Sequence, residues 1–300
     1  MIDYALQLLP LLAINIILAS SLGIINGYCG LFSLGHAGFY AVGAYAGASI
    51  TLFGFPELME TWPHLLLLLS SLGGMVAAGI VGILVGVPCL RLGGDYLAVA
   101  TLGFGEIIRI VFLNFAAVGG ATGLTGIPQL ATTRTQTWFY FGAVAVTLWL
   151  FRNLINSSFG RCVIAVREDE IAARSMRVNV RFYKVFSFVI GSAFAGLAGA
   201  LFAHFQQALH PSNFTFLISV QVLLMIVLGG LGSQFGAVLG ATIVTLLPEF
   251  LRFSETLAEV QMLIFGLVMV IVMLWRPDGL AGLFRREAGP ANKKDAHAVA

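Results

Sequence analysis

Residues 64–89 have the sequence HLLLLLSSLGGMVAAGIVGILVGVPC, which contains no Asp, Glu, Lys or Arg. About 20 apolar residues in a helix cross the hydrocarbon core of a bilayer, so this stretch predicts a membrane-spanning helix. Similar stretches recur along the chain. Of its 300 residues, 59% are hydrophobic and 10% are charged, against roughly 25% charged in a soluble domain. We therefore expect lipid to cover much of the surface.

The spacing of the apolar stretches predicts an all-α, polytopic membrane helix bundle with about nine spans, eight and ten being the alternatives. The expected spans lie near residues 4–25, 30–53, 64–89, 95–118, 137–152, 185–207, 214–231, 235–251 and 258–275. Two of them, 214–231 and 235–251, are short and separated by a glycine-rich turn. They could instead form a re-entrant hairpin buried in protein.

Basic residues predict the orientation, because loops rich in Lys and Arg stay in the cytoplasm. Seven of the 16 Lys and Arg residues lie from Arg152 to Lys184, and five follow Trp275. We expect this loop and the C-terminus inside, and the N-terminus outside. The expected units are a transmembrane domain, 1–284, with a cytoplasmic loop at 152–184, and a polar cytoplasmic tail, 285–300.

The sequence lacks the common catalytic motifs. None of its three lysines lies in GxxxxGK[ST], so it has no P-loop, and neither HExxH nor GxSxG occurs. The cysteines have no paired spacing and predict neither a disulfide framework nor a metal site; they are Cys29, Cys89 and Cys162. We expect no catalytic residue and no metal ligand in this chain.

Polar residues interrupt the second apolar stretch at 27–45, GYCGLFSLGHAGFYAVGAY. Polar groups at membrane depth must be paired or face a cavity. Ser33, His36 and Tyr40 are spaced at i, i+3 and i+7, so in a helix they share one face. They either hydrogen-bond neighbouring helices or line a polar pathway.

A second polar segment is GGDYLAVATLGFGEIIR at 93–109. Asp95 follows two glycines and suits a helix N-cap. Glu106 and Arg109 are three residues apart inside the span, so they can neutralise each other. A structural pair and a transport site both fit this pattern, and a pathway here would also include Tyr96 and Thr101.

Two loops have compositions that suggest a role. The expected outside loop 119–128 is rich in Gly and Thr; it suits a plain connection or a gate facing a binding protein. In the basic cytoplasmic loop, Glu168, Asp169 and Glu170 suit the first turn of a short helix. Arg174 and Arg177 suit its last turn, because these charges complement the helix dipole.

Six segments, taken in order, resemble the LivM-type permeases of branched-chain amino-acid ABC importers. They are SLGHAGFYAVGAY (33–45), GDYLAVATLGFGEIIR (94–109), GLTGIP (123–128), REDEIAARS (167–175), VLGGLGSQFGAVLGA (227–241) and LIFGLVMVIVMLWRPDGL (263–280). The family usually has a Gly after the fourth segment, which ends a short helix in a left-handed cap. Here Arg177 stands in its place, which puts the tight turn in doubt.

The resemblance implies a bacterial inner-membrane importer with a second, LivH-type permease, two cytoplasmic ATPases and a periplasmic amino-acid-binding protein. ATP and Mg²⁺ would bind to the ATPases, with no cofactor in this chain and no nucleic-acid partner. It also implies that one segment couples to an ATPase; its residues are Glu168, Asp169, Glu170, Ala172, Ala173, Arg174, Ser175 and Met176. The family also transports urea and amides. An ion-coupled secondary transporter, with Asp95 or Glu106 as its coupling carboxylate, and a channel are the other classes.

Overall fold

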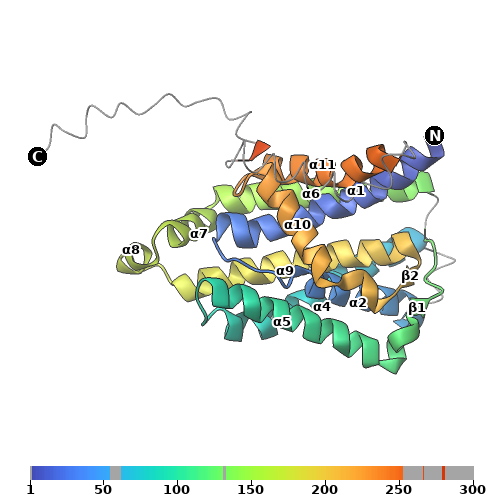
Figure 1. The fold of residues 1–300 in the computed structure, drawn as a ribbon, viewed down its shortest axis with the longest axis horizontal. Helices are drawn as coiled ribbons and strands as arrows, with labels where there is room; N and C mark the ends of the chain where they lie inside the picture. Colours follow the sequence, from blue (N-terminus) through green and yellow to red (C-terminus); the bar gives the residue numbers. More distant parts are fainter. Residues whose placement is uncertain (1, 55–61, 131–132, 253–265, 267–278, 281–300) are drawn as a thin grey trace, which may run out of the picture.

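The computed structural model describes residues 2–54, 62–130, 133–252, 266, 279 and 280. The larger helices are α1 (Ile2–Leu22), α2 (His36–Ser49), α4 (Pro63–Cys89), α5 (Asp95–Asn114), α6 (Thr133–Asn156), α9 (Val180–Gln206), α10 (Phe216–Gly229) and α11 (Gln234–Arg252). Most of them run side by side along the length of the bundle, and α10 crosses it obliquely (Figure 1). The predicted all-α membrane bundle is confirmed.

Shorter elements lie between these helices. A π-helical turn, η1 (Gly23–Tyr28), extends α1, and η2 (Ile50–Gly54) extends α2. Two helices, α7 (Ser158–Glu168) and α8 (Glu170–Ser175), project together at one end of the bundle (Figure 1). The opposite end carries η3 (Ala116–Val118), η4 (Gly120–Thr122), β1 (Leu124–Thr125), β2 (Ala208–Leu209) and η5 (Pro211–Phe214).

Five helices in the described part of the chain are long and apolar enough to cross a membrane. They correspond to expected spans: 64–89, for example, is Pro63–Cys89. The apolar helices α2 and α10 have 14 residues each, shorter than the expected spans, and α11 has 19. The expected span 258–275 and the tail 285–300 lie outside the described residues. The described part is therefore a multi-pass membrane bundle.

Successive larger helices run in opposite directions along the bundle (Figure 1). The N-terminus lies at the β1–β2 end, and α7–α8 lie at the other (Figure 1). Because β1 and β2 pair, the C-terminal ends of α5 and α9 meet at one end of the bundle. The α4–α5 connection therefore lies at the α8 end, together with Arg91.

Helix α9 lies at the centre of the bundle and packs against α1, α2 and α4. Glycines bring these backbones together. A Cβ on Gly43 of α2 would lie 2.1 Å from the Gly196 carbonyl oxygen of α9, and one on Gly199 would lie 2.0 Å from the Tyr40 oxygen. Only a residue without a side chain fits such contacts. The face of α9 that carries Gly191 and Gly199 thus packs against helices of the same chain.

An apolar face of α4 remains uncovered. Its exposed residues follow a helical spacing; they are Leu65, Leu68, Leu72, Val76, Ile80 and Ile83. Soluble monomers rarely expose a continuous apolar patch of this kind. The face suits lipid.

Candidate functional site

The chain leaves helical geometry between η1 and α2, inside the bundle. Asn26 holds this break through two hydrogen bonds with Ser33: its Nδ2 donates to the Ser33 oxygen at 3.4 Å, and its Oδ1 accepts from the Ser33 nitrogen at 3.3 Å. Thr101 of α5 accepts from the Leu34 nitrogen at 3.1 Å. Buried side chains therefore satisfy backbone groups that a helix would have paired, as irregular backbone at membrane depth requires.

Because of this break, the predicted helix over 30–53 is wrong in its first part, and Ser33, His36 and Tyr40 do not share one helix face. Gly30 has a φ of +71° and turns the chain. Gly35 lies so close to α5 that a Cβ would be 2.1 Å from the Thr101 oxygen. Helix α2 therefore begins only at His36. Ser33 precedes it, so only His36 and Tyr40 lie on consecutive turns.

All three of these residues are buried. His36 Nε2 lies 2.9 Å from Ser21 Oγ of α1, and Tyr40 packs its ring against Phe202 and Phe214. Ser33 Oγ and His36 Nδ1 form no hydrogen bond within the described residues.

Helix α5 carries the other predicted pathway residues. Gly94, with a φ of +56°, occupies the N-cap, so Asp95 is the first helical residue and not the cap. Its charge still complements the helix N-terminus. Tyr96 is exposed, and Thr101 is buried against the break.

The predicted pair between Glu106 and Arg109 is confirmed. Arg109 Nε donates to Glu106 Oε2 at 2.7 Å. The Glu106 side chain is 32% exposed and the Arg109 side chain 26% exposed. The pair therefore lies on a partly open face of α5 and not inside the bundle of this subunit.

The glycine-rich loop 119–128 is ordered by contacts at its end of the bundle. Leu124 pairs with Leu209, and Thr125 pairs with Ala208, in a two-stranded antiparallel sheet. His210 Nε2 lies 2.9 Å from the Ala121 oxygen. The loop is thus attached to the segment after α9, and its role as a gate stays a prediction.

The predicted short cytoplasmic helix is α8, at the other end of the bundle. Asp169 is its N-cap and accepts from the nitrogens of Ile171 and Ala172 at 2.8 and 3.1 Å. Glu170 occupies the first turn and forms an ion pair with Lys184 of α9. The prediction is wrong for Glu168, which ends α7, because the Asp169 cap separates the two helices.

The turn after α8 is preserved despite the arginine. Arg177 adopts the left-handed conformation, with a φ of +60°. Its nitrogen donates to the Arg174 oxygen at 3.0 Å, and the Val178 nitrogen donates to the Ala173 oxygen at 3.1 Å. These two bonds define a Schellman motif. The doubt that Arg177 raised is thereby removed.

Residues 4–273 match the family described as the branched-chain amino acid transport system permease component. This chain belongs to that family. The LivM high-affinity branched-chain amino acid permease of Escherichia coli is 39% identical over 91% of this chain and 68% of its own. A probable LivM of Methanocaldococcus jannaschii is 25% identical over 69% of this chain and 66% of its own.

A second E. coli protein of the same system matches more weakly. The LivH permease is 27% identical over 51% of this chain and 49% of its own. No solved structure matches. The permease family therefore rests on the sequence relationship over nearly the whole chain.

In this permease, only part of the predicted coupling segment is exposed on α8. Ala172 and Ser175 are exposed, and Met176 is 79% exposed. Ala173 is 4% exposed because it packs against Val166 and Val180. Ala173 therefore presents almost no surface outside this subunit, and its contact with a partner stays an untested prediction.

The predicted coupling residues do not include Ile171. Ile171 is 80% exposed at the start of α8. A large apolar residue among acidic and basic neighbours was the available signal. Exposed apolar side chains at the tip of a protruding helix are typical of protein contacts.

Proposed function

We propose that this chain is the permease subunit of an ATP-binding-cassette importer in the bacterial inner membrane, and that it carries branched-chain amino acids. The similarity to the LivM permease over 91% of the chain supports this most strongly. The chain has no P-loop, so two partner ATPases hold ATP and Mg²⁺. A periplasmic binding protein delivers the amino acid at the β1–β2 end.

Helix α8 is the contact to an ATPase in this proposal. It protrudes from one end of the bundle (Figure 1) and exposes Ile171 and Met176. A small apolar helix face suits a groove on a partner. The acidic N-cap and the basic last turn fix the direction in which α8 enters.

The open face of α5 meets a second permease subunit, of the LivH type. Glu106 lies eleven residues after Asp95, so it is about 16 Å along the helix and near the middle of the span. Charged groups at this depth do not face lipid but protein or a water-filled cavity. Because both charges of the pair are partly exposed in this subunit, a partner must cover them.

The translocation pathway then runs along this interface. Tyr96, Glu106 and Arg109 line it, and Asp95 stands at its expected cytoplasmic end. Thr101 ties α5 to the break, where Ser33, His36 and Tyr40 lie behind the interface. Movement of α5 would thereby reach the break through the bond between Thr101 and Leu34.

An ion-coupled transporter is less well supported. A coupling carboxylate must bind and release its ion, whereas Glu106 is held by Arg109 at 2.7 Å. The pair leaves no free negative charge at this position.

Reconstitution tests the function. The complex that co-purifies with this chain is placed in proteoliposomes with the binding protein, and uptake of labelled leucine is measured with and without ATP. We expect ATP-dependent uptake that valine and isoleucine suppress and urea does not. Uptake driven by a proton or sodium gradient without ATP would instead establish the secondary transporter. Suppression by urea alone would reassign the substrate.

A further inference from the structure

Arg167 occupies an unusual position in the α7–α8 pair. It lies in the last turn of α7, two residues before the Asp169 cap of α8. Its side chain reaches back to the membrane bundle: Nη1 donates to the Gly27 oxygen, at the end of η1, at 2.8 Å. A cation at a helix C-terminus is favourable, because it meets carbonyl groups left unpaired there.

Three glycines form the cradle of this side chain. A Cβ on Gly30 would lie 2.9 Å from Arg167 Cγ, and one on Gly232 would lie 3.1 Å from Nη1. A Cβ on Gly27 would lie 2.7 Å from the Gly232 nitrogen. The backbones of the α1–α2 break and of the α10–α11 turn thus meet around one guanidinium group.

The α7–α8 pair is well connected to Arg167 on its own side. Val166, next to Arg167, packs with Ala173 of α8 and Val180 of α9 in one buried cluster. The side chain of Asp169 caps α8 directly after α7. The last turn of α7 and α8 are therefore packed together as one unit.

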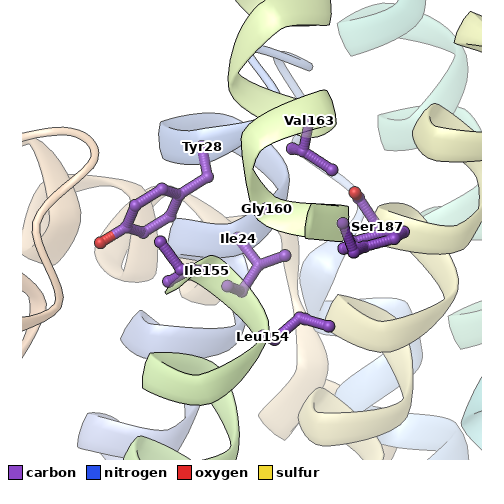
Figure 2. A pocket seen from close by; sticks show the side chains of 8 residues that line it. Ile24, Tyr28, Leu154, Ile155, Gly160, Val163 and Ser187 are labelled. Carbon is purple, nitrogen blue, oxygen red and sulfur yellow. The ribbon is translucent and has the colours of Figure 1, made fainter. Parts of the chain in front are cut away.

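Beside this connection, a small pocket lies between α7 and η1. Figure 2 shows this pocket, which lies between η1, the α6–α7 corner and α9 and has a cavity volume of about 10 Å³, roughly the room of one water molecule. Its lining includes Ile24, Tyr28 and Val163 and is largely apolar. The pocket is too small to separate the two elements, so the Arg167 hydrogen bond to η1 adds to direct packing between α7 and η1.

We propose that Arg167 is a positioning residue that transmits the movement of α7–α8 to the glycine-lined junction between the α1–α2 break and the α10–α11 turn. This inference rests on the proposed function, because it takes an ATPase on α8 as the source of the movement. Arg167 contacts the bundle through Nη1, and its Nε lies 3.5 Å from Glu168 Oε1 at the end of α7. Its loss should separate ATP hydrolysis from transport while the ATPase stays bound.

The test compares Arg167→Gln with Arg161→Gln, a matched change on the same helix. Arg161 makes hydrogen bonds to Asn156 and Ser158. Three quantities are measured on the reconstituted complex: the ATPase bound per permease, the rate of ATP hydrolysis and the leucine taken up per ATP hydrolysed. We expect Arg167→Gln to lower the last quantity about tenfold, as a typical coupling free energy allows, with the first unchanged. Arg161→Gln should leave all three unchanged.

Unchanged uptake per ATP in Arg167→Gln would overturn the inference. Loss of the bound ATPase would also overturn it, because Arg167 would then belong to the docking surface. If this variant does not accumulate, Arg167→Lys decides, since it keeps one charged donor: a partial loss of uptake per ATP supports the inference, and the wild-type value refutes it. A wild-type complex without ATP-dependent uptake would instead reject the proposed function itself.

Discussion

Arg109 and Glu106 lie one turn apart on α5 and are joined by a hydrogen bond of 2.7 Å, on a face that this subunit leaves partly open. Each charge compensates the other near the middle of the span. Glu106→Gln or Arg109→Gln leaves one charge unpaired, which costs about 3 kcal/mol at the centre of a membrane helix. We expect each single variant to accumulate poorly, and the double variant to accumulate better than either. The measurement is the amount of inserted protein per cell, and equal loss in all three variants would argue against direct pairing.

Cys162 reports the orientation of the bundle. It lies partly exposed on α7, whereas Cys29 and Cys89 are buried. If α7 is cytoplasmic, an impermeant maleimide should label Cys162 in inside-out vesicles and not in intact cells. Cys162→Ser should remove the label, which shows that the two buried thiols do not react. Labelling of intact cells would reverse the predicted topology.

Substitution by alanine should have opposite effects at two glycines, one in the close contact of α2 and α9 and one in open space on α6. Gly43→Ala places a methyl group 2.1 Å from the Gly196 oxygen, and overpacking of this kind destabilises by about 1–3 kcal/mol. Gly142 of α6 has no atom within 4 Å of its Cβ position, so Gly142→Ala should stabilise by about 0.5–1 kcal/mol through helix propensity. Thermal unfolding of the detergent-purified chain measures both, and a lower Tm for Gly142→Ala would contradict the second.

Hydropathy alone could locate the long helices, because lipid requires continuous apolar runs, and 64–89 was placed within one residue of Pro63–Cys89. It could not locate the break before α2. Residues 30–35 are as apolar as a helix, and their conformation depends on Gly30 in a left-handed turn and on Gly35 against α5. Two side chains satisfy the break: Asn26, seven residues before Ser33, and Thr101, 67 residues after Leu34. Hydropathy does not connect either of them with the break.

The segment that forms α8 shows the same limit on a smaller scale. Its charge pattern predicted a short helix correctly, but not where its cap falls or which alanine is buried. The burial of Ala173 depends on Val166 and Val180, which approach only when α7 and α9 pack. Glu106 and Arg109, by contrast, were predicted as a pair because their spacing on one helix is sufficient.

Arg177 holds the left-handed position where a glycine is better suited. A non-glycine residue there costs about 1 kcal/mol, while the two Schellman hydrogen bonds are retained. Arg177→Gly should therefore stabilise α8, and Arg177→Val should destabilise it, because a β-branched side chain is poorly tolerated at positive φ. Hydrogen exchange of the amides at 173–178 measures this: we expect slower exchange in the glycine variant. Faster exchange there would show that the arginine side chain itself stabilises the turn.

The exposed face of α8 carries the last prediction. Ala172 is exposed beside Ile171, and a bulky charged residue there should block entry of α8 into an ATPase groove without reaching the lipid-embedded bundle. Ala172→Asp should therefore accumulate normally, bind ATPase about 30-fold more weakly, as expected at the centre of an interface, and transport no leucine. Ile171→Ser should weaken binding in the same direction, because it removes an apolar anchor. Co-purification and uptake measure both effects.

The neighbouring alanine is the control for this experiment. Ala173 is buried with Val166 and Val180, so Ala173→Asp places a charge in an apolar cluster and should reduce the amount of folded protein. Ala172→Ser, which keeps the residue small, should bind ATPase and transport as the wild type does. Ala172→Asp would thus impair assembly with the ATPase, whereas Ala173→Asp, on the opposite face of α8, would impair folding. Normal leucine uptake by Ala172→Asp, with ATPase still bound, would show that α8 is not the coupling helix.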